Sequence, residues 1–333
     1  MESKGLITPE EFSQFCNRVV PLVIMEKYCR TNKEPFTAKI QVANYSEATL
    51  KAQSVKWELK KANGEIINQN QVTADISQGV LTDVASLNID LSKISKAEKL
   101  SLSIVLEGTQ YKNTYPVWVY PADVDTKVPE NILVSEKLDK TTLSKLSGGA
   151  TILLFPDFKD ITDLSVGGLY IPDYWNYRMF KGISESNKKP VSPGTMSILT
   201  NPELPLLSDF PTEFHTNWQW WPIVKNSRPF ILDNTPKDYR PLVQVVDNIE
   251  RNHKLGLIFE FAVGKGKLLV CMSNLKAIQD KPEGRQLYNN ILQYISSDKF
   301  NPAQALTQTE LVELFSTKVS AKKITGVKNI SYQ

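Results

Sequence analysis

The stretch of the sequence with the most chemical potential is residues 210–221, FPTEFHTNWQWW, which holds three of the six tryptophans and one of the two histidines. Glu213 and His215 lie two residues apart, so in a strand their side chains would share a face. A histidine beside a carboxylate can act as an acid–base pair. No convincing nucleophile accompanies them, since Thr212 and Thr216 are merely adjacent, so a structural hydrogen-bonded pair is the favoured interpretation.

The tryptophans of this stretch allow two interpretations. Indole rings stack on the apolar faces of sugars, and they also anchor cores and interfaces. If a helix begins at Trp218, then Trp218 and Trp221 share a face while Trp220 points elsewhere. Packing in a core or between domains is the main prediction, and a sugar-facing platform is the alternative. The residues predicted to meet a ligand or an interface are Trp175, Asn176, Glu213, His215, Trp218, Trp220 and Trp221.

Cys271 is a second candidate for chemistry, as the nucleophile of an amidotransferase-like α/β domain. A nucleophile elbow requires small residues on both sides of the nucleophile, but Leu269 and Ser273 stand two before and two after Cys271. We therefore assign no catalytic residue. A small hydrolase or transferase that uses Cys271, or the Glu213–His215 pair, remains the alternative function.

Other motifs are less informative. Residues 264–267, GKGK, lack the spacer and the following hydroxyl of a phosphate loop and join two apolar runs, which predicts a hairpin turn. The three cysteines are Cys16, Cys29 and Cys271, without a CxxC motif or a histidine at metal spacing, so we expect reduced thiols, no metal site and no cofactor.

The composition excludes several functional classes. Of 333 residues, 41% are hydrophobic and 23% charged, with a formal net charge of +3, which is too balanced to indicate nucleic-acid binding. No run of 18 apolar residues exists, so no membrane span is expected. The first residues, MESKGLITPEE, lack the apolar core of a signal peptide. Either the chain is cytoplasmic or the segment that directs export is not part of it, and localisation stays open.

The hydrophobic pattern predicts a short N-terminal segment followed by a β-domain. Residues 1–30 begin a helix at Thr8-Pro9-Glu10-Glu11 and continue as an apolar strip, and we predict a docking segment. Residues 31–122 alternate apolar and polar side chains, as in Val55, Trp57 and Leu59. About seven such strands, with a hairpin signal at Asn63-Gly64, predict an immunoglobulin-like β-sandwich.

In the second half of the chain, the hydrophobic residues recur with a different spacing. Residues 123–129 are a polar linker near two prolines. Residues 130–300 start with an apolar strand, a helix, the pair Gly148-Gly149 and a second apolar strand, the order of an α/β unit with a parallel sheet. We predict a flavodoxin-like or amidotransferase-like α/β domain here. Residues 301–333 are predicted to form a C-terminal helix and a loose tail.

Three stretches together resemble the C-terminal portion of β-galactosidase-like enzymes of glycoside hydrolase family 2, of the kind frequent in gut Bacteroidetes. Residues 7–22 are similar to the exit from the catalytic barrel, and residues 34–57 to the start of the following sandwich. Residues 210–221, 244–248 and 255–260 are similar to a terminal α/β domain, itself similar to class I glutamine amidotransferases without their nucleophile.

The resemblance implies an accessory role. The family hydrolyses glycosides with two glutamates on barrel strands, and no position here matches them because the barrel is not present. The implied function is to support a catalytic module, to oligomerise or to bind carbohydrate. The expected partners are therefore a carbohydrate, a catalytic glycosidase module or a second copy of the chain. If the chain belongs to an exported glycosidase, it would act in the periplasm or outside the cell.

Overall fold

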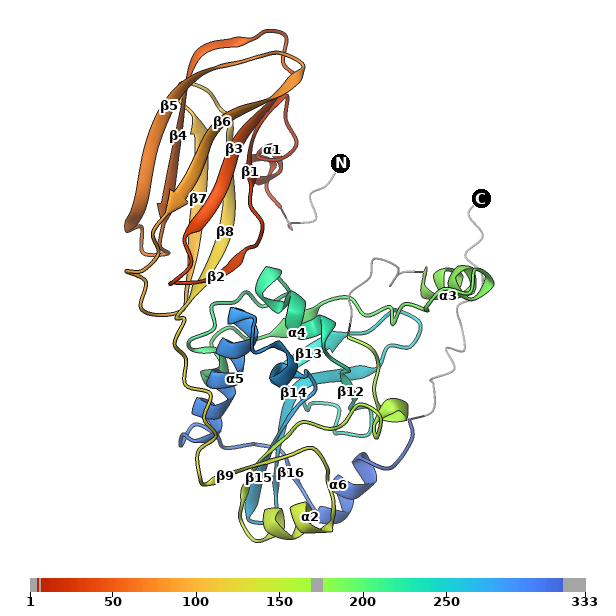
Figure 1. The fold of residues 1–333 in the computed structure, drawn as a ribbon. Helices are drawn as coiled ribbons and strands as arrows, with labels where there is room; N and C mark the ends of the chain where they lie inside the picture. The colour runs from red at the N-terminus through yellow and green to blue at the C-terminus, as the bar shows by residue number, and fades with distance from the viewer. Residues whose placement is uncertain (1–4, 6, 169–175, 320–333) are drawn as a thin grey trace. The chain divides into compact units, whose positions relative to one another are not determined.

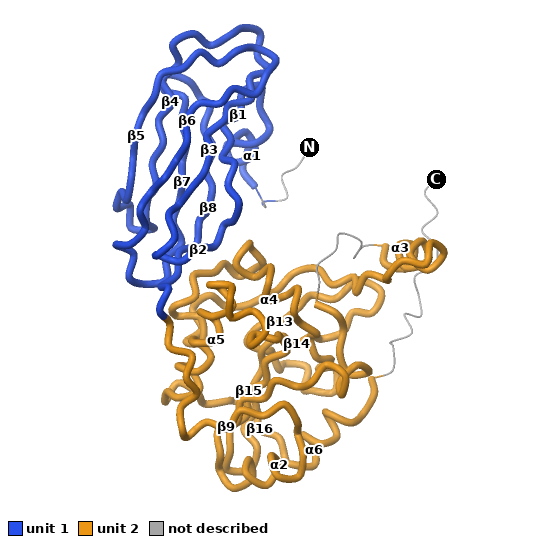
Figure 2. The backbone as a smooth tube through the Cα atoms, in the orientation of Figure 1, with its two compact units in different colours: residues 1–123 blue, residues 124–333 orange. Residues whose placement is uncertain are grey.

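The chain folds into two compact units, residues 1–123 and residues 124–333 (Figure 2). This computed structural model describes residues 5, 7–168 and 176–319. The architecture is a mixed, β-rich one with several sheets and few helices (Figure 1). Among the helices of the described residues, none is long and apolar enough to cross a membrane.

The first unit is a sandwich of two β-sheets. Its strands pair antiparallel, except for β2 and β8, which run parallel. The smaller sheet has the order β1 (Val19–Ile24), β3 (Phe36–Asn44), β6 (Val80–Ile89). The larger sheet has the order β2 (Cys29–Thr31), β8 (Lys112–Tyr120), β7 (Glu98–Leu106), β4 (Leu50–Lys60), β5 (Ile66–Ile76).

The core of the sandwich follows from the alternating pattern. Along β3, the apolar residues Phe36, Ala38 and Ile40 are buried while the intervening polar residues face outward. Trp57 of β4 is buried in the same core. The turn between β4 and β5 lies at Asn63-Gly64, where Gly64 takes a φ of 87°, a left-handed conformation that glycine adopts without steric cost. The strands and this turn are therefore located where the sequence places them.

The N-terminal residues differ from the predicted separate docking segment. Helix α1 (Pro9–Ser13) begins with a capping box between Thr8 and Glu11, as its sequence indicates. The apolar strip after it is strand β1, which pairs with β3 along its whole length. Val19 and Val23 are buried in the sandwich core. Residues 19–31 thus belong to the sandwich, because their apolar side chains find their partners there.

The second unit is built on a mixed β-sheet. Strands β9, β10 and β15 are mutually parallel. Strand β14 pairs antiparallel with β12, β13 and β15, and β13 pairs antiparallel with β11. The order is β11 (Ile198–Thr200), β13 (Val243–Val246), β14 (Lys254–Val263), β15 (Gly266–Cys271), β10 (Thr151–Leu154), β9 (Ile132–Ser135). Two short strands, β12 (Phe230–Ile231) and β16 (Ala305–Leu306), also pair with β14.

The tight turn at residues 264–265 explains why the sheet is not the predicted parallel one. A turn this short can join antiparallel strands only, since a parallel connection needs a long crossover. Gly264 takes a φ of 59° in the turn. At Gly266 a Cβ atom would lie 2.1 Å from the carbonyl oxygen of Leu146, so glycine allows the end of helix α2 (Lys140–Ser147) to approach β15. Among the described strands of this unit, parallel pairing is therefore limited to β9, β10 and β15 and to the short pair of β14 with β16.

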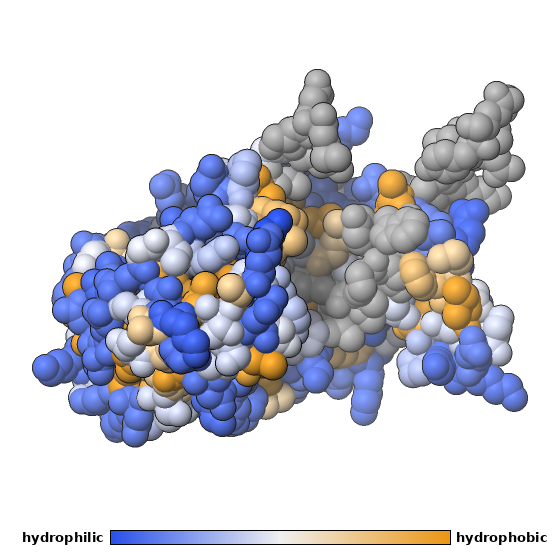
Figure 3. Space-filling model, turned by 90° about the horizontal axis from the view of Figure 1, so that it is seen from above, coloured by the Kyte–Doolittle hydropathy of each residue, from blue (hydrophilic) through white to orange (hydrophobic). Residues whose placement is uncertain are grey.

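The remaining helices complete the second unit. Helix α5 (Pro282–Ile295) is the longest of those described, and it buries Leu287, Ile291 and Ile295. The others are α3 (Tyr177–Ser186), α4 (Trp221–Lys225) and α6 (Gln308–Leu314). The surface in Figure 3 is mostly hydrophilic, with hydrophobic residues interspersed.

Candidate functional site

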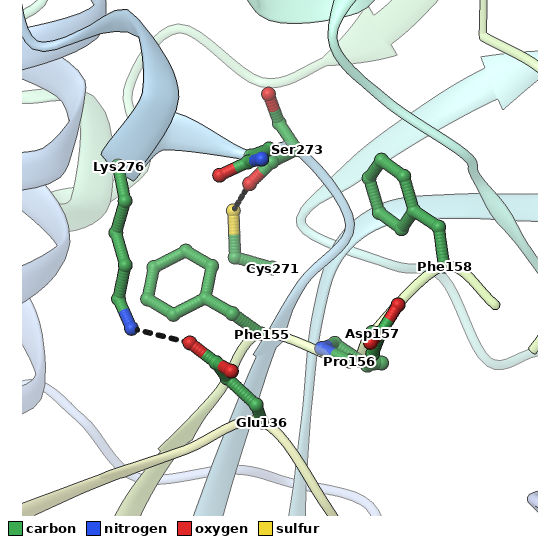
Figure 4. Close-up of a pocket in the computed structure, with 9 residues that line it drawn as sticks. Glu136, Phe155, Pro156, Asp157, Phe158, Cys271, Ser273 and Lys276 are labelled. Atoms are coloured by element: carbon green, nitrogen blue, oxygen red, sulfur yellow. Dashed lines mark hydrogen bonds and ion pairs between the residues drawn. The ribbon is translucent and has the colours of Figure 1, made fainter. Parts of the chain in front are cut away.

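A cavity of about 270 Å³ opens where the parallel strands β9, β10 and β15 end (Figure 4). The carboxyl edge of parallel strands is where α/β sheets commonly hold ligands, because the loops that follow the strands converge there. The residues that line the cavity are Glu136, Phe155, Pro156, Asp157, Phe158, Cys271, Ser273, Asn274 and Lys276. This cavity is the first place to look for the chemistry of the second unit.

Two charged groups of this cavity, those of Lys276 and Glu136, are paired with each other. Lys276 Nζ lies 3.0 Å from Glu136 Oε1, and the ammonium also lies 5.6 Å from the centroid of the Phe155 ring. Both charged side chains are substantially exposed to water. An exposed ion pair of this kind contributes at most about 1 kcal/mol to stability. The pair does shape the rim of the cavity, as Figure 4 shows.

Cys271 lies at the end of β15 in a setting that suppresses its reactivity. Its side chain is 1% exposed, and burial raises the pKa of the thiol to about 12. The thiol donates a hydrogen bond to the carbonyl oxygen of Ser273, with an S···O distance of 3.6 Å. Because the nucleophile of cysteine chemistry is the thiolate, the structure gives no support to a nucleophilic role for Cys271.

The closest histidine–carboxylate pair is Asp233–His253, which the sequence analysis did not identify. His253 Nδ1 lies 3.0 Å from Asp233 Oδ2, and both side chains are buried. The register of the strands explains the pair. Strands β12 and β14 pair antiparallel, with Ile231 opposite Leu255, and two residues further along this register residue 233 lies opposite residue 253. Asp233 also accepts a hydrogen bond from the backbone N–H of Lys254. The pair closes the end of the β12–β14 ladder.

Glu213 and His215 are held by other groups. His215 Nδ1 lies 3.0 Å from the carbonyl oxygen of Thr216, and the backbone of His215 pairs with Leu199 of β11. Glu213 Oε2 accepts a hydrogen bond of 3.4 Å from Gln219 Nε2. These contacts extend the edge of the sheet and tie the loop to the following helical turn, which is a structural role for both residues.

The three tryptophans divide as their spacing predicts. Trp220 is fully buried; its indole N–H donates to Thr212 Oγ1 at 2.8 Å, and its ring meets the Phe210 ring edge-on. Trp218 is 51% exposed and Trp221 is 44% exposed. Phe214, a few residues earlier, is also exposed. One tryptophan therefore anchors the core, while two present large apolar surfaces to solvent.

The local backbone places the two exposed tryptophans in consecutive helical turns. Trp218 opens the 3-10 turn η4 (Trp218–Trp220), and Trp221 begins helix α4 directly after it. Side chains three residues apart eclipse each other in a 3-10 helix. The Asn217 side chain accepts a hydrogen bond from the N–H of Trp218 and so fixes the start of the turn. We name the exposed side chains of Trp218 and Trp221 the aromatic patch.

The remaining predicted residues lie elsewhere. Trp175 falls outside the described residues. Asn176 caps helix α3, and its Nδ2 lies 3.5 Å from the sulfur of Met179. Within residues 5, 7–168 and 176–319, no cluster of three or more His, Cys, Asp or Glu side chains could hold a metal ion.

Comparison with solved structures finds distant similarity to glycosidases. A putative β-galactosidase from Bacteroides fragilis is 9% identical with a TM-score of 0.23, over 41% of this chain and 24% of that one. A β-glucuronidase from Parabacteroides merdae is 9% identical with a TM-score of 0.23, over 42% and 22%. A β-glucuronidase of glycoside hydrolase family 2 is 11% identical with a TM-score of 0.22, over 44% and 18%. The chain thus matches less than a quarter of the length of each of these proteins.

Comparison with sequences places the chain in a family. No curated protein matches it. Residues 34–121, in the sandwich, match a model described as a domain of unknown function (DUF8488). Residues 133–316, in the second unit, match a model described as a domain of unknown function (DUF8487). Because the latter match spans more than half of the 333 residues, the protein belongs to the DUF8487 family of domains of unknown function.

Proposed function

We propose that this chain is a non-catalytic accessory region of a glycoside hydrolase family 2-like protein, and that it binds carbohydrate through the aromatic patch. The observation that carries the proposal is the exposure of Trp218 and Trp221 on one helical turn. The resemblance of residues 7–22, 34–57 and 210–221 to the C-terminal portion of such enzymes supplies the glycosidase context.

Exposure of these rings is costly unless something covers them. Burial of apolar surface stabilises a protein by about 25 cal/mol per Å², and a tryptophan buries about 150–250 Å². Covering two half-exposed rings would therefore contribute roughly several kcal/mol. Contiguous apolar patches on a protein surface commonly mark interaction sites. The C–H face of a pyranose ring fits an indole ring, because it is apolar and nearly flat. Trp218 and Trp221 could thus hold one or two sugar units.

The chemistry of the second unit supports binding over catalysis. The thiol of Cys271 is protonated at neutral pH because burial raises its pKa to about 12. His253 is buried against Asp233, and His215 lies against a backbone carbonyl. A hydrolase or transferase that uses Cys271 or Glu213–His215 would need a free nucleophile or a base facing a cavity. We therefore favour carbohydrate binding over that alternative.

The origin of the second unit and its partners stay predictions. The parallel strands β9, β10 and β15 are the part of the sheet consistent with an amidotransferase-like domain. A catalytic glycosidase module and a second copy of the chain are the other candidate occupants of the aromatic patch. The attribution to Bacteroidetes, and a periplasmic or extracellular location, depend on the same glycosidase context.

Tryptophan fluorescence tests the proposal directly. Neutral galacto-oligosaccharides are titrated into the wild-type protein and into the double variant Trp218→Ala/Trp221→Ala. We expect a saturable spectral change in the wild type and its loss in the double variant, since Trp57, Trp118 and Trp220, the other tryptophans among the described residues, are buried. No release of reducing sugar is expected from either protein.

A matched control separates binding from general effects of removing an aromatic ring. Tyr45 is an aromatic residue of the first unit that is even more exposed, and Tyr45→Ala should leave the titration unchanged. A titration curve that is the same in wild type and double variant would refute the proposal. If the double variant instead turns a dimer into a monomer in light scattering, and sugars have no effect, the aromatic patch is an interface between copies.

A further inference from the structure

A second cavity in the same unit, of about 500 Å³, has a strongly cationic lining. Among the described residues that line it, there is no aspartate or glutamate. The polar side chains of the lining are Lys225, Arg228, Arg251, Ser165, Ser192 and Ser227, accompanied by Tyr177. We name this cavity the basic cavity.

Arg228 is the fixed cation of the basic cavity. Its Nε donates to Ser165 Oγ at 3.0 Å, and its Nη2 donates to the carbonyl oxygens of Thr162 and Ser165 at 3.4 Å. These partners are all neutral. Within the described part of the chain, no carboxylate forms an ion pair with Arg228. The guanidinium is therefore held in position without a carboxylate partner among the described residues, which suits it to binding an anion.

Lys225 and Arg251 complete the charge distribution. Lys225 ends helix α4, is exposed, and forms no ion pair with any residue that the structure describes. Arg251 is already neutralised by Asp247, with an Nη2–Oδ1 distance of 2.6 Å, and its guanidinium stacks 4.8 Å from the centroid of the Tyr177 ring. The excess positive charge of the basic cavity thus comes from Lys225 and Arg228, and Arg251 with Tyr177 forms a wall.

The backbone makes the basic cavity a preformed feature. The N–H of Val166 donates to the carbonyl of Pro229 at 3.0 Å, and the N–H of Gly168 donates to the carbonyl of Ser227 at 3.2 Å. At Gly168 a Cβ atom would lie 1.9 Å from Ser227 Oγ, so this approach requires glycine. The two segments therefore form a short ladder that carries Arg228 on it.

The basic cavity borders the aromatic patch. Trp221 is the first and Lys225 the last residue of helix α4. Side chains four residues apart lie on the same face of a helix, with about 5–6 Å between their Cβ atoms. A sugar ring on Trp221 would therefore bring its substituents within reach of the Lys225 ammonium, at the rim of the basic cavity.

We propose that the basic cavity binds the carboxylate or sulfate group of an acidic sugar whose ring stacks on Trp221. This inference rests on the proposed carbohydrate-binding function and specifies the class of its ligand. Nη1 of Arg228, the guanidinium nitrogen that the contacts to Ser165 and Thr162 do not use, would donate to the oxyanion, and Lys225 would add a second charge. Ser165 and Ser227 already donate their hydroxyl protons to the carbonyl oxygens of Ile161 and Val224, so the recognition of the oxyanion rests on the two cations.

The test compares three probes of equal length: a neutral galactan oligosaccharide, an oligogalacturonate and a sulfated galactan oligosaccharide. Their dissociation constants are measured by calorimetry. We expect the acidic probes to bind about tenfold tighter, the size of one charge-assisted hydrogen bond. The ratio should fall when salt rises from about 0.05 to about 0.5 M, because ions screen the attraction. Preference for one acidic probe identifies the oxyanion.

Variants locate the effect. Lys225→Gln and Arg228→Lys should each lower the acidic-to-neutral affinity ratio several-fold. The second should do so because lysine keeps the charge but loses the guanidinium contacts to Ser165 and Thr162 that hold it in position. Lys299→Gln removes the same charge from an exposed position outside the basic cavity and should not change the ratio. Circular dichroism establishes that the variants are folded.

Three outcomes separate the two proposals. Equal affinity for neutral and acidic probes in the wild type overturns the acidic-sugar inference and leaves the proposed function standing. The same loss in Lys299→Gln as in Lys225→Gln overturns it too, because the attraction is then unspecific. Binding of none of the three probes removes the proposed function and the inference together.

Discussion

The thiols offer the sharpest test of the non-catalytic interpretation of the second unit. Cys16 is exposed, whereas Cys29 and Cys271 are buried. Burial raises the pKa of Cys271 to about 12. At about pH 8 such a thiol is ionised in roughly one molecule in ten thousand, whereas an ordinary thiol with a pKa near 8.5 is ionised in about a quarter. Ionisation alone therefore slows Cys271 more than about a thousandfold, and its lack of exposure slows it further.

The assay is alkylation of the native protein with iodoacetamide, followed by mass spectrometry of the cysteine peptides over time. We expect Cys16 to be modified rapidly and Cys271 to stay unmodified on that timescale. Cys16→Ser should leave the native protein almost unreactive. All three cysteines should react in denaturing guanidinium chloride, which shows that the reagent is competent.

Rapid modification of Cys271 in the folded protein would refute this reasoning. It would mean that the thiolate is accessible and that its pKa is depressed, which is the signature of a nucleophilic cysteine. The hydrolase or transferase alternative would then replace the accessory function. Modification of Cys271 only in step with global unfolding, measured by circular dichroism, supports the account.

Three further predictions concern stability. Trp220→Ala should lower the free energy of unfolding by about 3–5 kcal/mol, as for a fully buried aromatic ring, while Trp218→Ala should change it by less than about 1 kcal/mol; urea denaturation of both variants measures this difference. Burial raises the pKa of Glu260, although a hydrogen bond from Tyr294 opposes the rise. The contribution of Glu260 to folding stability is therefore complete below the ordinary glutamate pKa, and it is lost as the pH rises through the folded-state pKa. Glu260→Gln should therefore stabilise the protein near pH 7 and have little effect near pH 4, and equal effects at both values would contradict the assignment. Val23→Asp should unfold the first unit by placing an unpaired charge in the sandwich core, while calorimetry shows an unchanged transition for the second unit.

Local patterns in the sequence predict a good part of the first unit. The alternation of apolar and polar residues around Trp57 predicts where β4 lies and which of its side chains face the core. The turn at Asn63-Gly64 follows from two residue types that tolerate positive φ. The capping box of Thr8 and Glu11 is also local. The surface that the strip at residues 22–25 covers was left open, because its partner, β3, lies some twenty residues away and periodicity alone does not reveal which surface an apolar strip covers.

The second unit shows where such reasoning stops. The spacing of Trp218, Trp220 and Trp221 separates the buried ring from the exposed ones, since helical geometry is local. The parallel prediction was wrong for β11, β12 and β13 and for the pairing of β14 with β15, because strand direction depends on how distant segments pair. The Arg228–Ser165 contact joins residues 63 positions apart, and no short-range signal predicts it. The basic cavity is therefore visible only in the folded chain.

The most direct test of the central claim is the calorimetric dissociation constant of the wild type and of Trp218→Ala/Trp221→Ala for the same oligosaccharide. The account predicts saturable binding by the wild type, a loss of at least about tenfold in the double variant, equivalent to about 1.4 kcal/mol, and an intact oligosaccharide at the end of the titration. Equal affinity of the two proteins, or cleavage of the sugar by the wild type, would contradict it.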